Sequence, residues 1–265
     1  MKKISYEGKG LAYDRSGSGR QTPVVLLHGF CEDHRMWSEW IPFLPARPYL
    51  CIDLPGFGQS DPVVPVSMEY MADAVAAVLD HLKIDTCLLV GHSMGGYVSL
   101  AFAARHPGRL AALCLFHSHP FADTPERKEA RLKSVSFIEQ NGHILYVRHM
   151  IPQLFSYDYS KGYPAEVNRL IHHASQFAPA AITAALHAMR NRPDRSSVLR
   201  DLACPVLLLI GKLDTAVPFE QSLEMTGLPR QASVEIFNSV GHMGMFTAAR
   251  ETAKAFREFL QQFGL

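Results

Sequence analysis

The segment 91–96, Gly-His-Ser-Met-Gly-Gly, contains the serine of this chain that is best placed to act as a nucleophile. It follows the apolar run 86–90 and precedes a helix-like run at 97–103. A Gly-x-Ser-x-Gly sequence between a strand and a helix places its serine on a sharp turn, with the hydroxyl exposed above the sheet. Glycines flank the serine because side chains there would collide where strand and helix approach each other. The segment therefore predicts Ser93 as a nucleophile.

A serine hydroxyl is a poor nucleophile at neutral pH. It needs a histidine to take its proton and an acid to orient that histidine. Asp214 and His242 follow two later apolar runs, and no other histidine follows Asp214. The chain order serine, aspartate, histidine is one of the known orders of a catalytic triad. Asp214 could instead be an ordinary turn residue or a helix cap.

His117 and His119 form a His-x-His pair after the apolar run 110–116, with Asp123 nearby. Such a pair could bind a metal ion. The alternative, which we favour, is that the two histidines line a pocket or cap the loop, and we expect no metal. Asp123 is also the rival candidate for the acid, because no carboxylate stands closer to the end of that run.

Short apolar runs alternate with longer helical patterns, which predicts an α/β fold with a mostly parallel, doubly wound sheet. A hairpin over 3–7 and 11–15 is expected to precede the parallel strands. The predicted parallel strands are 24–27, 49–52, 86–90, 110–116, 206–210 and 234–237. Ligands in open α/β sheets bind beyond the carboxyl ends of such strands, so the polar residues that follow them should share one site.

The segment from 120 to the strand at 206–210 has no strand pattern. Apolar residues recur there at helical spacing over 126–140, 165–177 and 180–191. We therefore predict a helical cap over 120–200, inserted after the sixth strand and covering the site. Residues 1–119 and 201–265 are predicted to form the core.

Composition indicates a globular enzyme rather than a disordered or nucleic-acid-binding protein. Hydrophobic residues make up 48% and charged residues 19% of the chain, and the net charge of +1 gives no reason to expect nucleic acid or an anionic membrane as partner. The five cysteines have no zinc-type spacing. The first residues lack the apolar segment of a signal peptide, so we expect a cytoplasmic protein.

Together these motifs resemble the α/β-hydrolase superfamily, in its branch of capped serine hydrolases of the carboxylesterase type. The resemblance covers nearly the whole chain. The segments that carry it are 28–30 (His-Gly-Phe), 53–58 (Asp-Leu-Pro-Gly-Phe-Gly), 91–96, 211–214 (Gly-Lys-Leu-Asp) and 241–242 (Gly-His).

The resemblance implies roles for individual residues. Ser93 would be the nucleophile, Asp214 the acid and His242 the base. The backbone N–H groups of Phe30 and Met94 would form the oxyanion hole. Met94 is also expected on physical grounds, because amides in the first turn of a helix have no intrahelical partner. The supporting residues would be His28, Gly29, Gly91 and Gly95.

The predicted activity is hydrolysis of an apolar carboxylic ester of a small or medium acyl group. It would proceed through an acyl-enzyme at Ser93, without a cofactor, in a monomer or homodimer. Three alternatives remain open: C–C bond hydrolysis of a ring-fission diketone, cofactor-free perhydrolysis of the haloperoxidase type, and ligand sensing without catalysis. The serine argues against haloalkane dehalogenases and epoxide hydrolases, relatives that need a carboxylate at this position.

Overall fold

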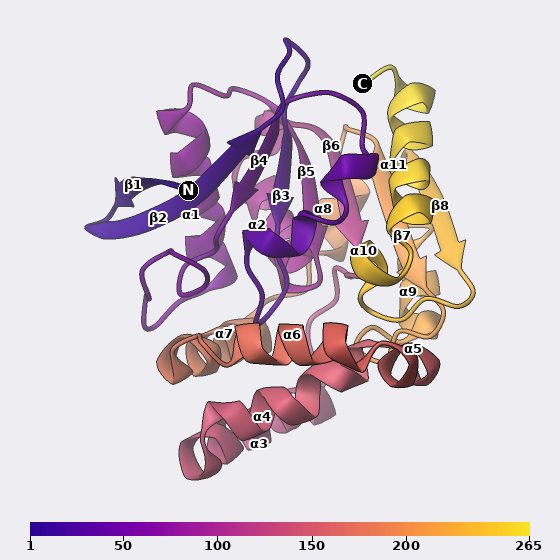
Figure 1. Cartoon of the computed structure of the whole chain (residues 1–265). Coiled ribbons are helices and arrows are strands. Elements are labelled where there is room, and N and C mark those ends of the chain that lie inside the picture. Colours follow the sequence, from indigo (N-terminus) through magenta and orange to yellow (C-terminus); the bar gives the residue numbers. More distant parts are fainter.

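The computed structural model describes residues 1–265 and contains one eight-stranded sheet with helices on both faces (Figure 1). The strand order is β1-β2-β4-β3-β5-β6-β7-β8. Strands β1 (Lys2–Tyr6) and β2 (Lys9–Ser16) form a hairpin, and β2 pairs antiparallel with β4. The remaining strands run parallel: β3 (Val24–Leu27), β4 (Tyr49–Ile52), β5 (Cys87–His92), β6 (Leu110–Phe116), β7 (Val206–Gly211) and β8 (Ala232–Phe237). The predicted fold class is confirmed.

Strands β3, β4 and β6 have the predicted bounds, whereas β5 differs from its predicted range of 86–90. It begins at Cys87 and continues through His92. The extension arises because Gly91 pairs with Leu115, and His92 with Phe116, in the neighbouring strand. The sheet therefore extends to the residue directly before Ser93.

Helices cover both faces of the sheet. On one face α1 (Met68–His81) packs against α2 (Met94–Arg105), which also contacts α8 (Ser196–Asp201). On the other face α11 (Ala249–Phe263) packs against the short turn Ile41–Phe43. There Trp40 Nε1 donates a hydrogen bond of 3.0 Å to Thr252 Oγ1. The smaller helices are α9 (Phe219–Met225), α10 (Gly244–Thr247) and the 3₁₀ turns His34–Trp37 and Pro107–Arg109.

Helices α3 to α7 connect β6 to the chain that leads into β7, and they gather beyond one end of the sheet (Figure 1). Their bounds are α3 (Pro125–Asn141), α4 (His143–Met150), α5 (Tyr157–Gly162), α6 (Pro164–Ala174) and α7 (Pro179–Asn191), with a 3₁₀ turn at Ile151–Leu154. The sequence predicted three helices here and missed α4 and α5. Six to eight residues make too few turns to show a helical period.

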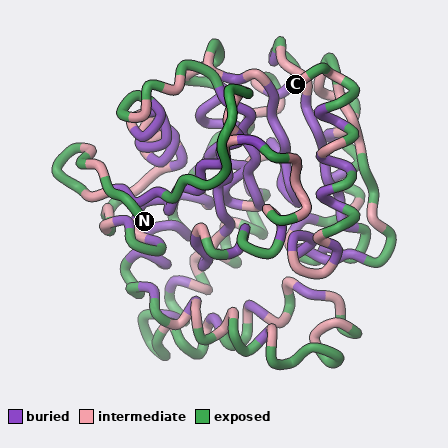
Figure 2. The backbone as a smooth tube through the Cα atoms, turned by 45° about the horizontal axis from the view of Figure 1, so that its top comes forward, coloured by how far each residue is buried: buried purple, intermediate pink, exposed green.

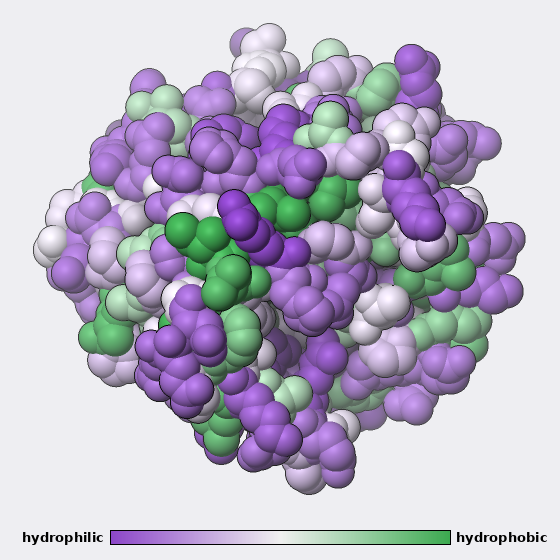
Figure 3. Space-filling model, turned by 60° about the horizontal axis from the view of Figure 1, so that its bottom comes forward, coloured by the Kyte–Doolittle hydropathy of each residue, from purple (hydrophilic) through white to green (hydrophobic).

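The surface of this end of the molecule is mostly hydrophilic, with hydrophobic side chains gathered near its centre (Figure 3). Phe137 of α3 and Leu145 of α4 are among the large hydrophobic residues left exposed. None of the helices combines the length and the apolar composition that a membrane-spanning helix requires.

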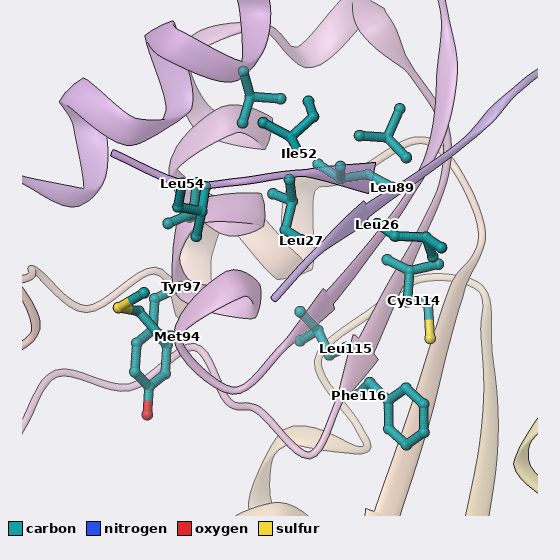
Figure 4. Close-up of a cluster of buried hydrophobic side chains, with 14 of the residues drawn as sticks. Leu26, Leu27, Ile52, Leu54, Leu89, Met94, Tyr97, Cys114, Leu115 and Phe116 are labelled. Atoms are coloured by element: carbon teal, nitrogen blue, oxygen red, sulfur yellow. The ribbon is translucent and has the colours of Figure 1, made fainter. Parts of the chain in front are cut away.

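The core lies around the central strands, which are buried on both faces (Figure 2). Leu26 and Leu27 of β3, Leu89 of β5, and Leu115 of β6 are fully buried and belong to the same hydrophobic cluster (Figure 4). Such continuous apolar runs are typical of parallel strands covered on both sides. This packed center fixes the ends of β3, β5 and β6, from which the loops of the site emerge.

The central position of Leu89 predicts a large loss of stability on truncation. Leu89→Ala should lower the free energy of unfolding by about 2–5 kcal/mol, because the buried side chain leaves a cavity that packing cannot fill. Denaturant unfolding measures this loss. Leu145→Ala, at a position 50% exposed, is the control and should change stability by about 0.5 kcal/mol or less. Equal losses in the two variants would contradict the assignment of the core.

Candidate active site

Ser93 lies on a strained turn between β5 and α2. Its backbone has φ +49° and ψ −113°, a conformation that residues other than glycine rarely adopt. The turn is stabilised from both sides: Ser93 N–H donates to the Phe116 carbonyl (3.0 Å), and the Ser93 carbonyl accepts from Ser118 Oγ (2.8 Å). Strain of this kind persists only where surrounding structure enforces it, and it is typical of functional sites.

The glycines on either side of this turn allow close backbone contact. A Cβ atom on Gly91 would lie 2.4 Å from the carbonyl oxygen of Gly95. A Cβ atom on Gly95 would lie 2.3 Å from the carbonyl oxygen of Leu27, at the end of β3. Both distances are far below a van der Waals contact, so the turn requires glycine at the two positions.

Asp214 and His242 form a buried hydrogen-bonded pair. His242 Nδ1 lies 2.7 Å from Asp214 Oδ2, and the two residues are 3% and 6% exposed. The other oxygen, Asp214 Oδ1, accepts from the backbone N–H groups of Ala216 (2.8 Å) and Val217 (2.9 Å). Burial by itself would raise the pKa of Asp214, but the charge and hydrogen bond of His242 lower it below its ordinary value. The carboxylate is therefore ionised and fixed in orientation.

The loop that carries His242 is bound to two other parts of the chain. His242 N–H donates to the Leu154 carbonyl (2.9 Å), at the end of the 3₁₀ turn between α4 and α5. The His242 carbonyl accepts from His92 Nε2 (2.9 Å). Close by, Thr215 Oγ1 donates to the Gln153 carbonyl (2.7 Å). Residues 153 and 154 thus connect the helices between β6 and β7 to the Asp214 and His242 loops.

Ser93 and His242 both line one cavity of about 310 Å³. The Ser93 hydroxyl is not hydrogen-bonded to the histidine ring, and such contacts commonly tighten only when substrate binds. Strand β5, helix α2 and the loops after the strands contribute Phe30, Glu32, His92, Ser93, Tyr97, Thr215, Ala216, Val217 and His242 to the wall. Helices α3, α4 and α7, with the turn at 151–154, contribute Arg127, Ala130, Arg131, Ser134, Tyr146, His149, Met150, Gln153, Leu154, Leu186 and Met189.

Phe30 and Met94, the predicted oxyanion donors, lie at the ends of the two neighbouring strands β3 and β5. Met94 is the first residue of α2, where a backbone N–H has no partner within the helix. Phe30 follows β3 and lines the cavity. His28 braces this loop, since its Nδ1 donates to the Gly29 carbonyl (2.8 Å) and its Nε2 accepts from Leu54 N–H (2.9 Å). Burial lowers the pKa of His28, which keeps its ring neutral.

Glu32 is a residue of the cavity wall that sequence reasoning missed. Its side chain is 5% exposed, and Oε2 accepts from Gly29 N–H (3.2 Å) and lies 3.3 Å from His92 Nδ1. His92 in turn donates to the His242 carbonyl, so Glu32 connects the loop after β3 with the loop after β8. In the sequence, Glu32 is marked only by its position close after His-Gly-Phe. That its carboxylate is buried follows from the fold and cannot be read from the sequence.

The structure does not bring His117, His119 and Asp123 together as a group of metal ligands, and each contacts other protein atoms. His117 Nδ1 accepts from Gly211 N–H (3.1 Å). His119 Nδ1 accepts from Phe121 N–H (3.2 Å), and its Nε2 lies 3.1 Å from the Tyr97 hydroxyl. Asp123 binds the guanidinium groups of Arg131 and Arg192 rather than a histidine. The rival acid is therefore not paired with the candidate base.

One other cluster has the residue types of a metal site. The ligand atoms of Asp33, His34 and Asp53 lie within 4.8 Å of one another. His34 Nδ1 is already bound to Asp53 Oδ1 (2.8 Å), and Asp33 Oδ2 accepts from His173 Nε2 (2.8 Å) on α6. Burial favours the neutral acid, but the hydrogen bond and charge of His173 hold the pKa of Asp33 well below its ordinary value. The cluster joins α6 to the core.

Comparison with known proteins shows the family to which the chain belongs. Residues 22–141 match the family model described as alpha/beta hydrolase fold. A solved structure of a thermophilic esterase from Thermogutta terrifontis, with malate bound, is 30% identical and superimposes with a TM-score of 0.92 over 100% of both chains. The chain belongs to the alpha/beta hydrolase superfamily.

Curated relatives cover most of the chain as well. A pimeloyl-[acyl-carrier protein] methyl ester esterase from Neisseria meningitidis is 29% identical over 90% of this chain and 93% of its own length. A 2-hydroxy-6-oxononadienedioate/2-hydroxy-6-oxononatrienedioate hydrolase from Cupriavidus pinatubonensis is 29% identical over 94% of this chain and 88% of its own length. These relatives support a hydrolase activity.

The buried state of His119 predicts sensitivity to acid. Burial is the largest cause that lowers its pKa to about 3, whereas a histidine in the unfolded chain titrates near 6.5. Between these values the unfolded state binds the extra proton, so stability falls as the pH falls. From pH 7 to pH 5 the parent should lose about 2 kcal/mol more unfolding free energy than His119→Gln, measured by denaturant titration. The exposed His187→Gln variant should follow the parent, and a parallel loss in His119→Gln would contradict the argument.

Proposed function

We propose that this protein is a cofactor-free serine hydrolase of the carboxylesterase type that cleaves esters of a small or medium acyl group. The observation that carries the proposal is the convergence of Ser93 and the Asp214–His242 pair on one cavity. The cavity volume of about 310 Å³ lies near the lower end of the range for small-molecule sites, which favours a compact acyl group.

In the proposed reaction Ser93 Oγ attacks the ester carbonyl carbon while its proton passes to His242 Nε2. The carbonyl electron pair moves to oxygen, and the N–H groups of Phe30 and Met94 donate to that oxyanion. When the intermediate collapses, the C–O bond to the alcohol breaks and the leaving oxygen takes the proton from His242. Water then releases the acyl group from Ser93 by the same steps, with His242 again as base. Asp214 stabilises the imidazolium and fixes its tautomer.

We also propose that residues 120–200 act as a cap whose wall selects the substrate, and that 1–119 and 201–265 form the core. In support, more than half of the cavity-lining residues belong to that insertion. Similarity of fold indicates which reaction the chain can catalyse. The choice of substrate depends on the residues that line the cavity.

A second candidate is hydrolysis of a C–C bond in a ring-fission diketone. It is favoured by the relative from Cupriavidus pinatubonensis, whose named substrate contains a ketone and two carboxylates but no ester. The same nucleophile, base and oxyanion donors would serve that reaction. Turnover of a 2-hydroxy-6-oxo-dienoate with no turnover of any ester would favour this candidate over the first.

Replacement of the nucleophile gives the most direct test. Ser93→Ala should abolish hydrolysis of p-nitrophenyl acetate, butyrate and octanoate, because no other group can form the acyl-enzyme, while circular dichroism shows an intact fold. Ser38→Ala, at an exposed serine that does not line the cavity, is the control and should keep parental rates. A rate for Ser93→Ala within about tenfold of the parent would reject serine catalysis.

Replacement of the acid tests its role in the triad. Asp214→Asn should lower kcat by about four orders of magnitude, because an amide stabilises the wrong tautomer of His242. Steady-state kinetics on p-nitrophenyl butyrate measure the effect. Asp201→Asn, whose side chain is 72% exposed, is the matched control and should keep the parental kcat. A parental kcat in Asp214→Asn would mean that another residue serves as the acid.

A further inference from the structure

A group of three charged side chains lies at the cavity wall formed by α3 and α7. Asp123 is 2% exposed in its side chain and faces two arginines, Arg131 (12%) and Arg192 (3%). Arg192 Nη1 donates to Asp123 Oδ1 at 2.7 Å, and its guanidinium carbon lies 3.8 Å from the Tyr97 ring centroid. One carboxylate therefore faces two guanidinium groups, which leaves one positive charge without a carboxylate partner.

Arg131 is the arginine of this group whose guanidinium faces the cavity without a full set of oxygen acceptors. Nε of Arg131 donates to Asp123 Oδ2, and Nη2 lies 3.4 Å from Oδ1. Nη1 has only a sulfur partner, Met189 Sδ at 3.5 Å, which is a weak acceptor. Arg192 by contrast directs its terminal nitrogens to Asp123 and to the carbonyls of Met189 and Phe121. Arg131, but not Arg192, lines the cavity that contains Ser93.

Other charged groups of the cavity wall add to the same field. Arg127, one turn before Arg131 on α3, lines the cavity, and its guanidinium donates only to the Ala216 carbonyl (2.9 Å). The one acidic residue of the wall, Glu32, lies on the core side and already binds Gly29 N–H next to His92. The α3 side of the cavity thus carries two guanidinium groups and no carboxylate.

We propose that the α3 side of this cavity is a carboxylate-binding subsite, and that the substrate is an ester which also carries a carboxylate. The proposal rests on the ester hydrolase function proposed above and names its substrate class. The substrate carboxylate would accept from Arg131 Nη1 in place of the Met189 sulfur, with Arg127 contributing at the exposed rim. A guanidinium group suits this role, since its planar donors match carboxylate geometry and a charge-assisted hydrogen bond is stronger than a neutral one.

Binding without catalysis tests the subsite first. Ser93→Ala protein is titrated calorimetrically with glutarate and, separately, with neutral dimethyl glutarate. Glutarate should bind more tightly than the dimethyl ester. In the double variant Ser93→Ala/Arg131→Gln, glutarate binding should be weaker by at least about tenfold. Arg131→Gln leaves Asp123 paired with Arg192, so the fold should survive, and a thermal melt checks this. Lys133→Gln, on the same helix but 76% exposed and outside the cavity, is the charge-matched control.

Kinetics with the active protein test the substrate class. The ratio of kcat/KM for monomethyl glutarate to that for methyl butyrate should fall at least about tenfold in Arg131→Gln and stay at the parental value in Lys133→Gln. Arg131→Lys, which keeps the charge but loses the planar fork, should give an intermediate ratio. Carboxymethyl butyrate places the carboxylate on the alcohol side instead, and the better of the two substrates identifies the side that faces Arg131.

The outcomes separate this proposal from the function on which it rests. An unchanged ratio and unchanged glutarate binding in a folded Arg131→Gln protein would overturn the carboxylate subsite, even if neutral esters are hydrolysed. Arg131-dependent glutarate binding without hydrolysis of any ester would support the subsite and refute the ester hydrolase. Equal losses in Arg131→Gln and Lys133→Gln would show a general effect of charge and would overturn the subsite.

Discussion

The buried hydrogen bond between Asp214 and His242 is the interaction on which the rest of the site depends. A carboxylate removed from water requires compensating partners, and Asp214 has the imidazole on one oxygen and two backbone N–H groups on the other. These contacts form only if the loops after β7 and β8 arrive at the same place. Neighbouring parallel strands with paired carboxyl ends meet that condition, so the sheet is what brings Asp214 and His242 together.

The helices between β6 and β7 take part in positioning as well as in covering the cavity. The carbonyls of Gln153 and Leu154 accept hydrogen bonds from Thr215 and His242, and Arg127 donates to Ala216. The loops that carry Asp214 and His242 are therefore fixed from two sides, by the strand ends and by this insertion. A change in the insertion can consequently alter both the shape of the cavity and the placement of His242.

The core side and the insertion side of the cavity contribute different chemistry. The loops after the strands supply the strained Ser93 turn, the hydrogen-bonded Asp214–His242 pair and the candidate oxyanion donors. The insertion supplies most of the remaining wall, including the guanidinium of Arg131. Under the function proposed above, the reaction chemistry and the choice of substrate would be carried by separate stretches of the chain. The two curated relatives differ in their named substrates.

The sequence by itself determined the fold class, because apolar runs of strand length alternating with helical patterns have few other solutions. It also singled out Ser93, Asp214 and His242 as candidates, since each stands in the short segment that follows such a run. Only the tertiary structure decided that Glu32 is buried beside His92, that Asp123 binds Arg131 and Arg192, and that Leu154 binds His242. Most of these contacts join segments that are far apart in the sequence. Their partners are therefore set by packing in three dimensions and cannot be found from a local pattern.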